Sequence, residues 1–260
     1  MSHQQTVVLV DADNTLWDTD AVFQEAQLLL LTRVEEEAGA ACRAVDRLEF
    51  VRSYDQALAL RHHLHLRYPP QLLARSVEAG LSGVDPEAAA REAISGRLPA
   101  AGLLDQAGVD AIVTDYAQAL SRTPLLLPTV AEGVSVARRA GLRLYVMTEG
   151  RVEMQKRILE LHGLLASFDG VWELTKELSQ FGRVVSRFVG CRIVVIGDQP
   201  DRDILPAKAA GCSTVLIPSR FKPSWQTHKD QEQADHLALD FLDAARWCVK
   251  ADAESALDFG

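Results

Sequence analysis

The sequence has few of the features that mark secreted, membrane-spanning or nucleic-acid-binding proteins. Its longest unbroken leucine run, at residues 28–31, is far shorter than the roughly 20 apolar residues that span a bilayer. The four cysteines have no CxxC spacing, and the first ten residues have neither the basic start nor the apolar core of a signal peptide. No Lys/Arg-rich block with interleaved aromatic residues stands out. We therefore expect a cytoplasmic protein with reduced thiols and with neither a membrane nor a nucleic acid as partner.

The composition is that of an ordinary globular protein. The chain has 260 residues, of which 48% are hydrophobic, and 27 basic residues face 36 acidic ones to give a formal net charge of −9. This length fits one large domain, or a core domain that carries an inserted one. An anionic ligand would need local positive charge, because the overall charge is negative. The oligomeric state cannot be predicted from these numbers.

One stretch near the N-terminus combines a buried strand with acidic residues. Residues 7–10 are apolar and mostly β-branched, a pattern typical of a parallel strand covered on both faces, and Asp11 and Asp13 follow directly. The carboxyl ends of such strands are where open α/β sheets bind ligands. Neighbouring carboxylates repel each other, and their hard oxygen atoms suit Mg²⁺. Asp11 and Asp13 could therefore bind a metal ion, or they could simply cap the turn that follows; the sequence pattern fits both interpretations.

The rest of the chain divides into a helical block and a strand-and-helix alternation. Residues 19–124 contain no convincing strand pattern, whereas strands are expected at 142–147, 171–172, 191–196 and 213–218, with helices between them. The alternation predicts a doubly wound parallel α/β sheet, a Rossmann-like core, formed by residues 1–18 and 125–260. The block at 19–124 is then an inserted helical cap domain. A last helix is expected at 237–249, followed by a frayed tail from residue 251.

Polar residues follow three of the expected strands. Asp11 and Asp13 follow the first, Thr148 follows the strand at 142–147, and Asp198 follows the strand at 191–196. Because the carboxyl ends of parallel strands meet at one edge of a sheet, these side chains should converge there.

The motifs in this order resemble those of the haloacid dehalogenase-like hydrolase superfamily, in its C1-capped phosphatase branch. Asp11 to Leu16 is similar to the first motif, DxDxT, and Thr148 to the second. Gly197-Asp198 with Asp203 is similar to the fourth. The third motif is a lysine that precedes the fourth.

Two lysines are candidates for the third motif. Lys176 has the better context, because it stands 22 residues before Asp198 after an expected strand, although Glu177 follows it where family members often have proline. Lys156 lies on the helix after Thr148, where a solvated surface position is the commoner role of a lysine.

The resemblance implies a role for each residue. Asp11 would be the nucleophile that accepts a phosphoryl group, and Asp13 the general acid and base. Thr148, Glu149 and Lys176 would bind the phosphoryl group. The metal ligands would be Asp11, Asp198 and, through its backbone carbonyl, Asp13. Asp203 would support the metal site, with Asp201 as the alternative.

The resemblance also implies the function. We expect a Mg²⁺-dependent hydrolase that removes phosphate from a small phosphorylated metabolite through an aspartyl-phosphate intermediate. A phosphomutase would use the same motifs, and a dehalogenase would use the same nucleophile, although Asp13 argues against a dehalogenase. A non-catalytic binding protein on this fold is the alternative of another class. The identity of the substrate stays open.

Overall fold

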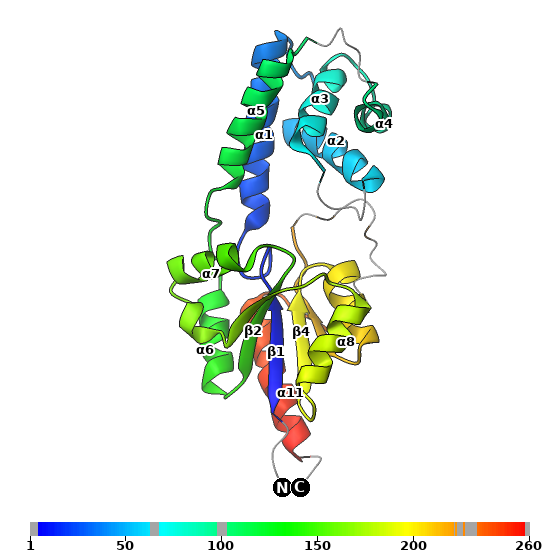
Figure 1. Ribbon diagram of the computed structural model, residues 1–260. Coiled ribbons are helices and arrows are strands. Elements are labelled where there is room, and N and C mark those ends of the chain that lie inside the picture. Colours follow the sequence, from blue (N-terminus) through cyan, green and yellow to red (C-terminus); the bar gives the residue numbers. More distant parts are fainter. Residues whose placement is uncertain are drawn as a thin grey trace. The chain divides into compact units, whose positions relative to one another are not determined.

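A six-stranded parallel sheet forms the centre of the α/β part of the protein (Figure 1). The structure is a computed structural model, and it describes residues 5–62, 68–97, 103–220, 222, 226 and 233–257. The strand order is β3-β2-β1-β4-β5-β6, and the expected doubly wound α/β fold is thereby confirmed. The strands are β1 (Thr6–Asp11), β2 (Arg143–Thr148), β3 (Gly170–Glu173), β4 (Arg192–Gly197), β5 (Ser213–Leu216) and β6 (His236–Leu237).

Strand β1 is central and buried on both faces. All six of its residues are buried, and it pairs in parallel with β2 on one side and β4 on the other. Its side chains alternate between two hydrophobic clusters, with Val8 and Val10 in one and Val7 and Leu9 in the other. This period of two is that of a strand with a core on each side.

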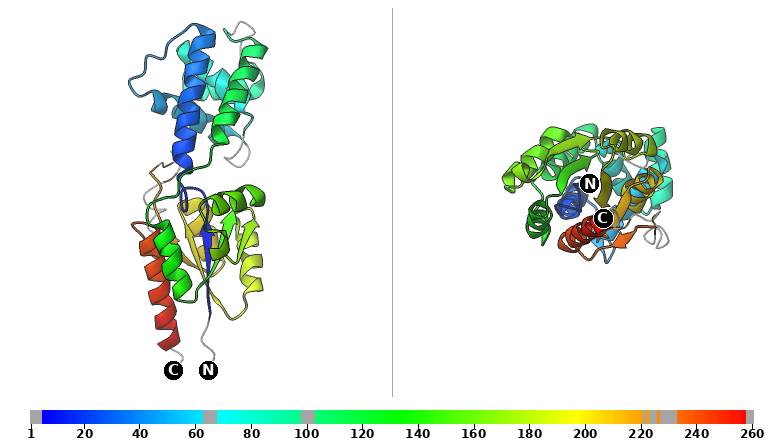
Figure 2. Two further views of the ribbon diagram at one scale, coloured as in Figure 1. Left: turned by 90° about the vertical axis from the view of Figure 1, so that its left-hand side faces the viewer. Right: turned by 90° about the horizontal axis from the view of Figure 1, so that it is seen from below.

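Helices cover both faces of the sheet. The cluster that contains Val8 and Val10 is completed by three helices, α6, α7 and α11, and α6 and α11 lie side by side (Figure 2). The opposite cluster is completed by α8 and α9. These helices are α6 (Val130–Arg139), α7 (Val152–Leu161), α8 (Leu178–Arg187), α9 (Leu205–Ala209) and α11 (Phe241–Leu257).

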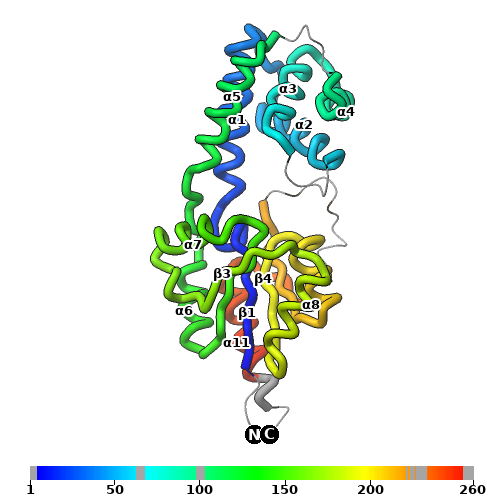
Figure 3. Tube along the Cα trace, in the orientation of Figure 1, coloured from blue at the N-terminus to red at the C-terminus, as the bar shows by residue number. Residues whose placement is uncertain are grey.

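The chain divides into two compact units. One comprises Met1–Thr19 with Pro124–Gly260, and the other is Asp20–Thr123. The second unit is helical in its described residues and has its own hydrophobic cluster, which includes Leu30, Leu58 and Leu73. Helices α1 and α5 run side by side in it (Figure 3). Its helices are α1 (Thr19–Ala38), α2 (Arg47–Arg61), α3 (Pro70–Leu81), α4 (Pro86–Ser95) and α5 (Gln106–Leu120).

The two segments that lead into and out of the helical unit are joined to each other within the α/β unit. The amide of Asp18 donates to the carbonyl of Leu125 at 2.8 Å, and the amide of Leu127 donates to the carbonyl of Leu16 at 2.9 Å. The insertion therefore begins and ends at neighbouring points of the α/β unit, directly after β1.

The C-terminal region differs from the sequence-based expectation. Residues 236 and 237 form strand β6, which pairs with β5, and the last helix begins only at Phe241. Asp240 ends the preceding loop, where its carboxylate accepts the amide of Asp243 and so stabilises the helix start. The helix then runs through residues that were expected to fray. A two-residue strand is too short to show a period, so the pattern there favoured helix.

Two further expectations concern the helical unit and the membrane. The apolar spacing of residues 46–68 alone favours one long helix there, whereas helix α2 ends at Arg61; residues 63–67 lie outside the described residues. Over the part of the chain that the structure describes, no helix combines the length and the apolar character that crossing a bilayer would require.

Candidate active site

The turn after β1 begins the site. Asn14 has a positive φ of 57°, a conformation that asparagine tolerates better than most residues. Its amide donates to the carbonyl of Trp17 at 2.8 Å, and the amide of Leu16 donates to the carbonyl of Ala12 at 2.9 Å. This tight turn leaves Asp11 buried at the end of the strand and Asp13 partly exposed.

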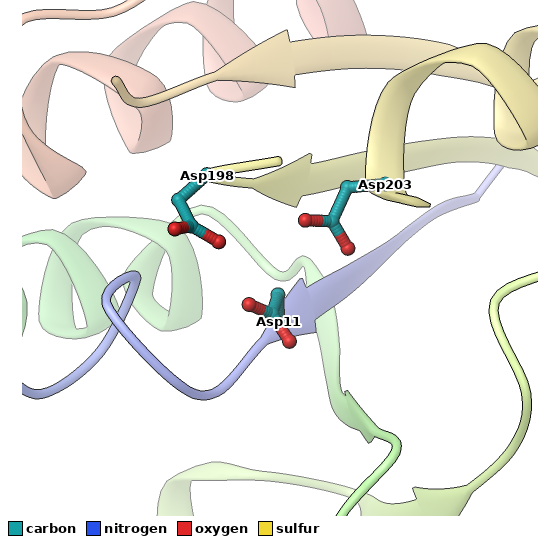
Figure 4. A group of neighbouring side chains, drawn as sticks. All are labelled: Asp11, Asp198 and Asp203. Carbon is teal, nitrogen blue, oxygen red and sulfur yellow. The ribbon is translucent and has the colours of Figure 1, made fainter. Parts of the chain in front are cut away.

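Three carboxylates meet at the carboxyl edge of the sheet. Asp11 ends β1, Asp198 follows β4, and Asp203 lies in a π-helical turn, Pro200–Ile204. Their side chains point toward one another (Figure 4), and one oxygen from each lies within 4.8 Å of the others. All three residues are buried. The group lies between β1 and β4, the point at which the strand order reverses and where doubly wound sheets bind ligands.

Lys176 contributes a buried positive charge to the same group. It lies between β3 and α8 and is only 6% exposed. Its Nζ donates to Oδ1 of Asp11 at 2.5 Å and lies 2.6 Å from Oδ1 of Asp203. An ammonium group in this position can neutralise an anion that arrives at Asp11.

The pKa values of the group reflect its burial. Burial raises the pKa of Asp11 to about 7, against the lowering effect of Lys176. Burial also raises the pKa of Asp198 well above its usual range, and the charge of Asp11 adds to that rise. For Lys176, burial alone would lower the pKa, but the charges of Asp11 and Asp203 outweigh it and hold the pKa above its ordinary value.

The group fits a divalent cation. Three carboxylates and one ammonium carry a formal charge of −2, which a divalent cation would balance. The Oδ1 atom of Asp198 is buried and has no hydrogen-bond partner among the described residues. A buried carboxylate oxygen without a partner is costly, and a cation would supply the partner that it lacks. Oxygen ligands of this type suit Mg²⁺.

The carboxylate of Asp13 is held by three donors. Its Oδ1 accepts the hydroxyl of Thr19 at 2.6 Å and the indole N–H of Trp17 at 3.2 Å. Its Oδ2 accepts the amide of Gln155 at 3.4 Å. The side chain of Trp17 is fully buried, so it supports the turn from within the core.

Thr148 lies beside Asp13 in this network. The side-chain amide of Gln155 also donates to Oγ1 of Thr148 at 3.3 Å, and the backbone amide of Gly150 donates to the same oxygen at 2.9 Å. Gln155 is 4% exposed on α7 and thus bridges Asp13 and Thr148. The sequence offered no signal for this role, because Gln155 belongs to none of the motifs.

Glu149 faces a cation and a backbone amide. Its Oε1 accepts the amide of Lys176 at 3.0 Å, and its Oε2 accepts Nε of Arg202 at 3.1 Å, while Nη2 of Arg202 forms an ion pair with Oε1. Arg202 was not among the expected site residues, although it lies inside the fourth motif.

Lys156 and Asp201, the alternatives to Lys176 and Asp203, both lie at exposed positions. Lys156 is exposed on α7, whereas Lys176 lies in the carboxylate group. Asp201 is also exposed and accepts a hydrogen bond from Gln226 at 2.8 Å, whereas Asp203 is fully buried. Residues Asp11, Asp198, Asp203 and Lys176 are therefore brought together, with Asp13 and Thr148 linked beside them through Gln155.

Comparisons with known proteins identify a family for most of the chain. Residues 5–211 match the family model described as a haloacid dehalogenase-like hydrolase. Among curated proteins, none matches the chain.

Solved structures of similar fold cover nearly the whole chain. A haloacid dehalogenase-like family hydrolase from Xanthomonas campestris is 18% identical with a TM-score of 0.61, over 98% of this chain and 100% of that one. A predicted phosphoglycolate phosphatase from Haemophilus somnus is 15% identical with a TM-score of 0.59, over 95% and 99%. A phosphatase from Thermococcus onnurineus is 16% identical with a TM-score of 0.52, over 94% and 97%. At these identities the likeness concerns the fold.

Proposed function

The chain belongs to the haloacid dehalogenase-like hydrolase family, and from this premise we propose that it hydrolyses a small phosphate monoester through an aspartyl-phosphate on Asp11, with Mg²⁺ as its cofactor. The observation that supports this most is the buried Asp11 carboxylate, held by Lys176, with a second acid two residues further along the chain. Phosphoryl transfer depends mainly on positioning and on neutralising the charge of the phosphoryl oxygens.

In the first step, an oxygen of Asp11 attacks phosphorus while the bond from phosphorus to the ester oxygen breaks. Asp13 gives its proton to the leaving alcohol, a role that suits a carboxyl group at the partly exposed rim of the site. Lys176 and Thr148 stabilise the charge on the transferred group, the first as a cation and the second as a hydroxyl donor.

In the second step, water attacks the phosphorus of the aspartyl-phosphate, and Asp13 accepts the proton that water loses. The Asp11 carboxylate leaves, inorganic phosphate forms, and the site returns to its starting state. Asp11 and Asp198 would supply the carboxylate oxygens that hold Mg²⁺, with the backbone carbonyl of Asp13 as a further ligand, and Asp203 would support the site beside them. When bound, Mg²⁺ would offset the negative charge of the carboxylates and of the phosphoryl oxygens.

The helical unit would act as a cap that selects the substrate. It is inserted directly after the turn that carries Asp13, and its two connecting segments are hydrogen-bonded to each other. A cap that excludes water protects an acyl-phosphate from premature reaction and strengthens the electrostatics of the site. The location in the cytoplasm stays a prediction.

A screen of phosphorylated metabolites with and without Mg²⁺ tests the proposal. We expect Mg²⁺-dependent release of inorganic phosphate, and a labelled phosphoryl group on Asp11 when the reaction is quenched early. In ¹⁸O-labelled water, a phosphatase places the label in phosphate. A phosphomutase would return an isomeric ester, and a dehalogenase would act only on a haloacid added to the screen, with the label then entering Asp11. No product with any ester or haloacid, in folded protein, would favour a binding protein.

A further inference from the structure

The side chain of Glu149 contacts the segment of chain that carries Lys176. Lys176 lies between β3 and α8, so its position is not set by a ladder of helix or strand hydrogen bonds. Its backbone amide instead donates to Oε1 of Glu149 at 3.0 Å. Glu149 follows Thr148, the last residue of β2, a strand that is paired on both sides. The backbone end of Lys176 is thus attached to the sheet through a side chain.

Arg202 fixes the carboxylate of Glu149. Its guanidinium contacts both carboxylate oxygens, Oε2 through Nε at 3.1 Å and Oε1 through Nη2. Such fork-shaped pairs are geometrically specific as well as charge-assisted. The two side chains are only 18% and 24% exposed, so solvent weakens the pair less than it weakens a surface ion pair.

The same lysine is held at its other end by the residue next to Arg202. The π-helical turn presents Arg202 to Glu149 and presents Asp203, its neighbour, to Nζ of Lys176 at 2.6 Å. A lysine side chain has many rotamers, and fixing both of its ends removes most of them in advance. A group preorganised in this way stabilises a developing charge without first having to be ordered.

We propose that Glu149 and Arg202 form a clamp that positions Lys176 through its backbone amide, and that Glu149 does not contact the substrate. Both oxygens of its carboxylate accept hydrogen bonds from Arg202 or Lys176. A carboxylate would also repel a phosphoryl group. Glu149 and Arg202 are then positioning residues that act on the reaction through Lys176, and this role rests on the proposed phosphoryl chemistry.

Kinetics of three variants test the clamp in the full-length protein. In E149Q and R202M we expect kcat to fall by about 10- to 100-fold, the usual scale for groups that orient a site residue, with KM within about threefold of wild type. The double variant should lose no more than either single one, since both residues serve one function. A rise in KM as the main effect, or losses that multiply in the double variant, would overturn the clamp.

The control variant is K208M, which removes a different ion pair of the same unit, that of Lys208 with Asp235. It should leave kcat and KM at wild-type values, so that loss of any ion pair is separated from loss of this one. A fall in kcat equal to that of R202M would count against a specific role for Glu149 and Arg202.

A measurement without substrate separates the clamp from the proposed function. Acetylation of lysines in the metal-free protein, followed by mass spectrometry, reports how protected each amine is. In wild type we expect slow labelling of the buried Lys176 and fast labelling of the exposed Lys156. The ratio of Lys176 to Lys156 labelling should rise several-fold in E149Q and R202M but not in K208M. An unchanged ratio would refute the clamp even if the protein is an active phosphatase, and a raised ratio would support it even if no ester is hydrolysed.

Discussion

The carboxyl group of Asp203 fills the space that a side chain at position 197 would need. A Cβ atom on Gly197 would overlap Cγ and Oδ2 of Asp203, whose Oδ2 also accepts the amide of Gln199 at 3.0 Å. The glycine that ends β4 is therefore a packing requirement of the carboxylate group. Because Asp203 also pairs with Lys176, it cannot move without disturbing that pair.

We predict that Gly197→Ala lowers the free energy of unfolding by about 1–3 kcal/mol, the range for overpacking a buried site, and weakens stabilisation by Mg²⁺. Gly182→Ala is the matched control, since a Cβ there meets open space on helix α8 and alanine is the better helix former. Denaturant unfolding with and without Mg²⁺ measures both effects. Equal behaviour of the two variants would contradict the packing argument.

A second prediction concerns the nucleophile. Asp11→Asn keeps the volume of the side chain but removes its negative charge and its ability to attack phosphorus. We expect kcat/KM to fall by at least about 10³-fold, because loss of one member of a catalytic unit disables the whole unit, while the circular dichroism spectrum stays that of wild type. Asp201→Asn, at an exposed acid near the same site, should retain full activity. Substantial turnover by Asp11→Asn would exclude covalent catalysis at this residue.

A third prediction follows from the raised pKa of Asp11. Burial shifts this pKa from 3.8 to about 7, so between those values the folded metal-free protein binds a proton that the unfolded chain releases. The stability of the metal-free protein should therefore fall as the pH rises from about 4 to about 7, as far as Asp11 contributes. Mg²⁺ competes with that proton and should raise Tm more at about pH 8 than at about pH 5.

Thermal melts with Mg²⁺ and with a chelator at both pH values check this. Asp11→Asn cannot bind the proton and should show a smaller dependence of the Mg²⁺ effect on pH. A Tm increment from Mg²⁺ that is equal or larger at pH 5 in wild type would show that the proton and the metal do not compete.

The two lysines allow a fourth prediction. Lys176→Ala should lower kcat/KM by about 10²-fold or more, the scale of removing one charge-stabilising donor, because Lys176 contacts Asp11. Lys156→Ala should stay within about twofold of wild type, since Lys156 is exposed on α7. Steady-state kinetics on the best ester decides between them. A larger loss in Lys156→Ala would move the phosphate-neutralising role to that residue.

The sequence predicted the sheet and the convergence of its strand ends. It did not predict the side-chain contacts that surround the carboxylates there. Residues 7–10 and 193–196 are apolar runs closely followed by an acid, and a parallel sheet brings such strand ends to one edge whatever lies between them in the sequence. Lys176 could be placed near them only by resemblance, because it lies in a connecting segment without a period. The pair of Glu149 and Arg202 joins residues 53 apart, and Gln155 reaches the site from a helix face. No local pattern encodes such contacts.

The last prediction concerns the independence of the two units. Within the part of the chain that the structure describes, the hydrophobic clusters on the two faces of the sheet contain only residues of the α/β unit, and the cluster of the helical unit contains only residues of that unit. The amide of Asp18 and the carbonyl of Leu125 are hydrogen-bonded at 2.8 Å, so the two ends of the insertion are close enough for a short linker to join them.

We therefore predict that the chain with residues 20–123 replaced by a short Gly/Ser linker folds. It should release phosphate from a small generic ester such as p-nitrophenyl phosphate, still dependent on Mg²⁺, because Asp11, Lys176 and Asp198 all remain. Its preference among phosphorylated metabolites should become weaker, since the unit proposed to select the substrate is gone.

The same deletion with Asp11→Asn is the control for contaminating phosphatase. If the folded deletion variant keeps the full substrate preference, selectivity lies in the α/β unit. If it binds Mg²⁺ but hydrolyses no ester, the helical unit takes part in the chemistry itself.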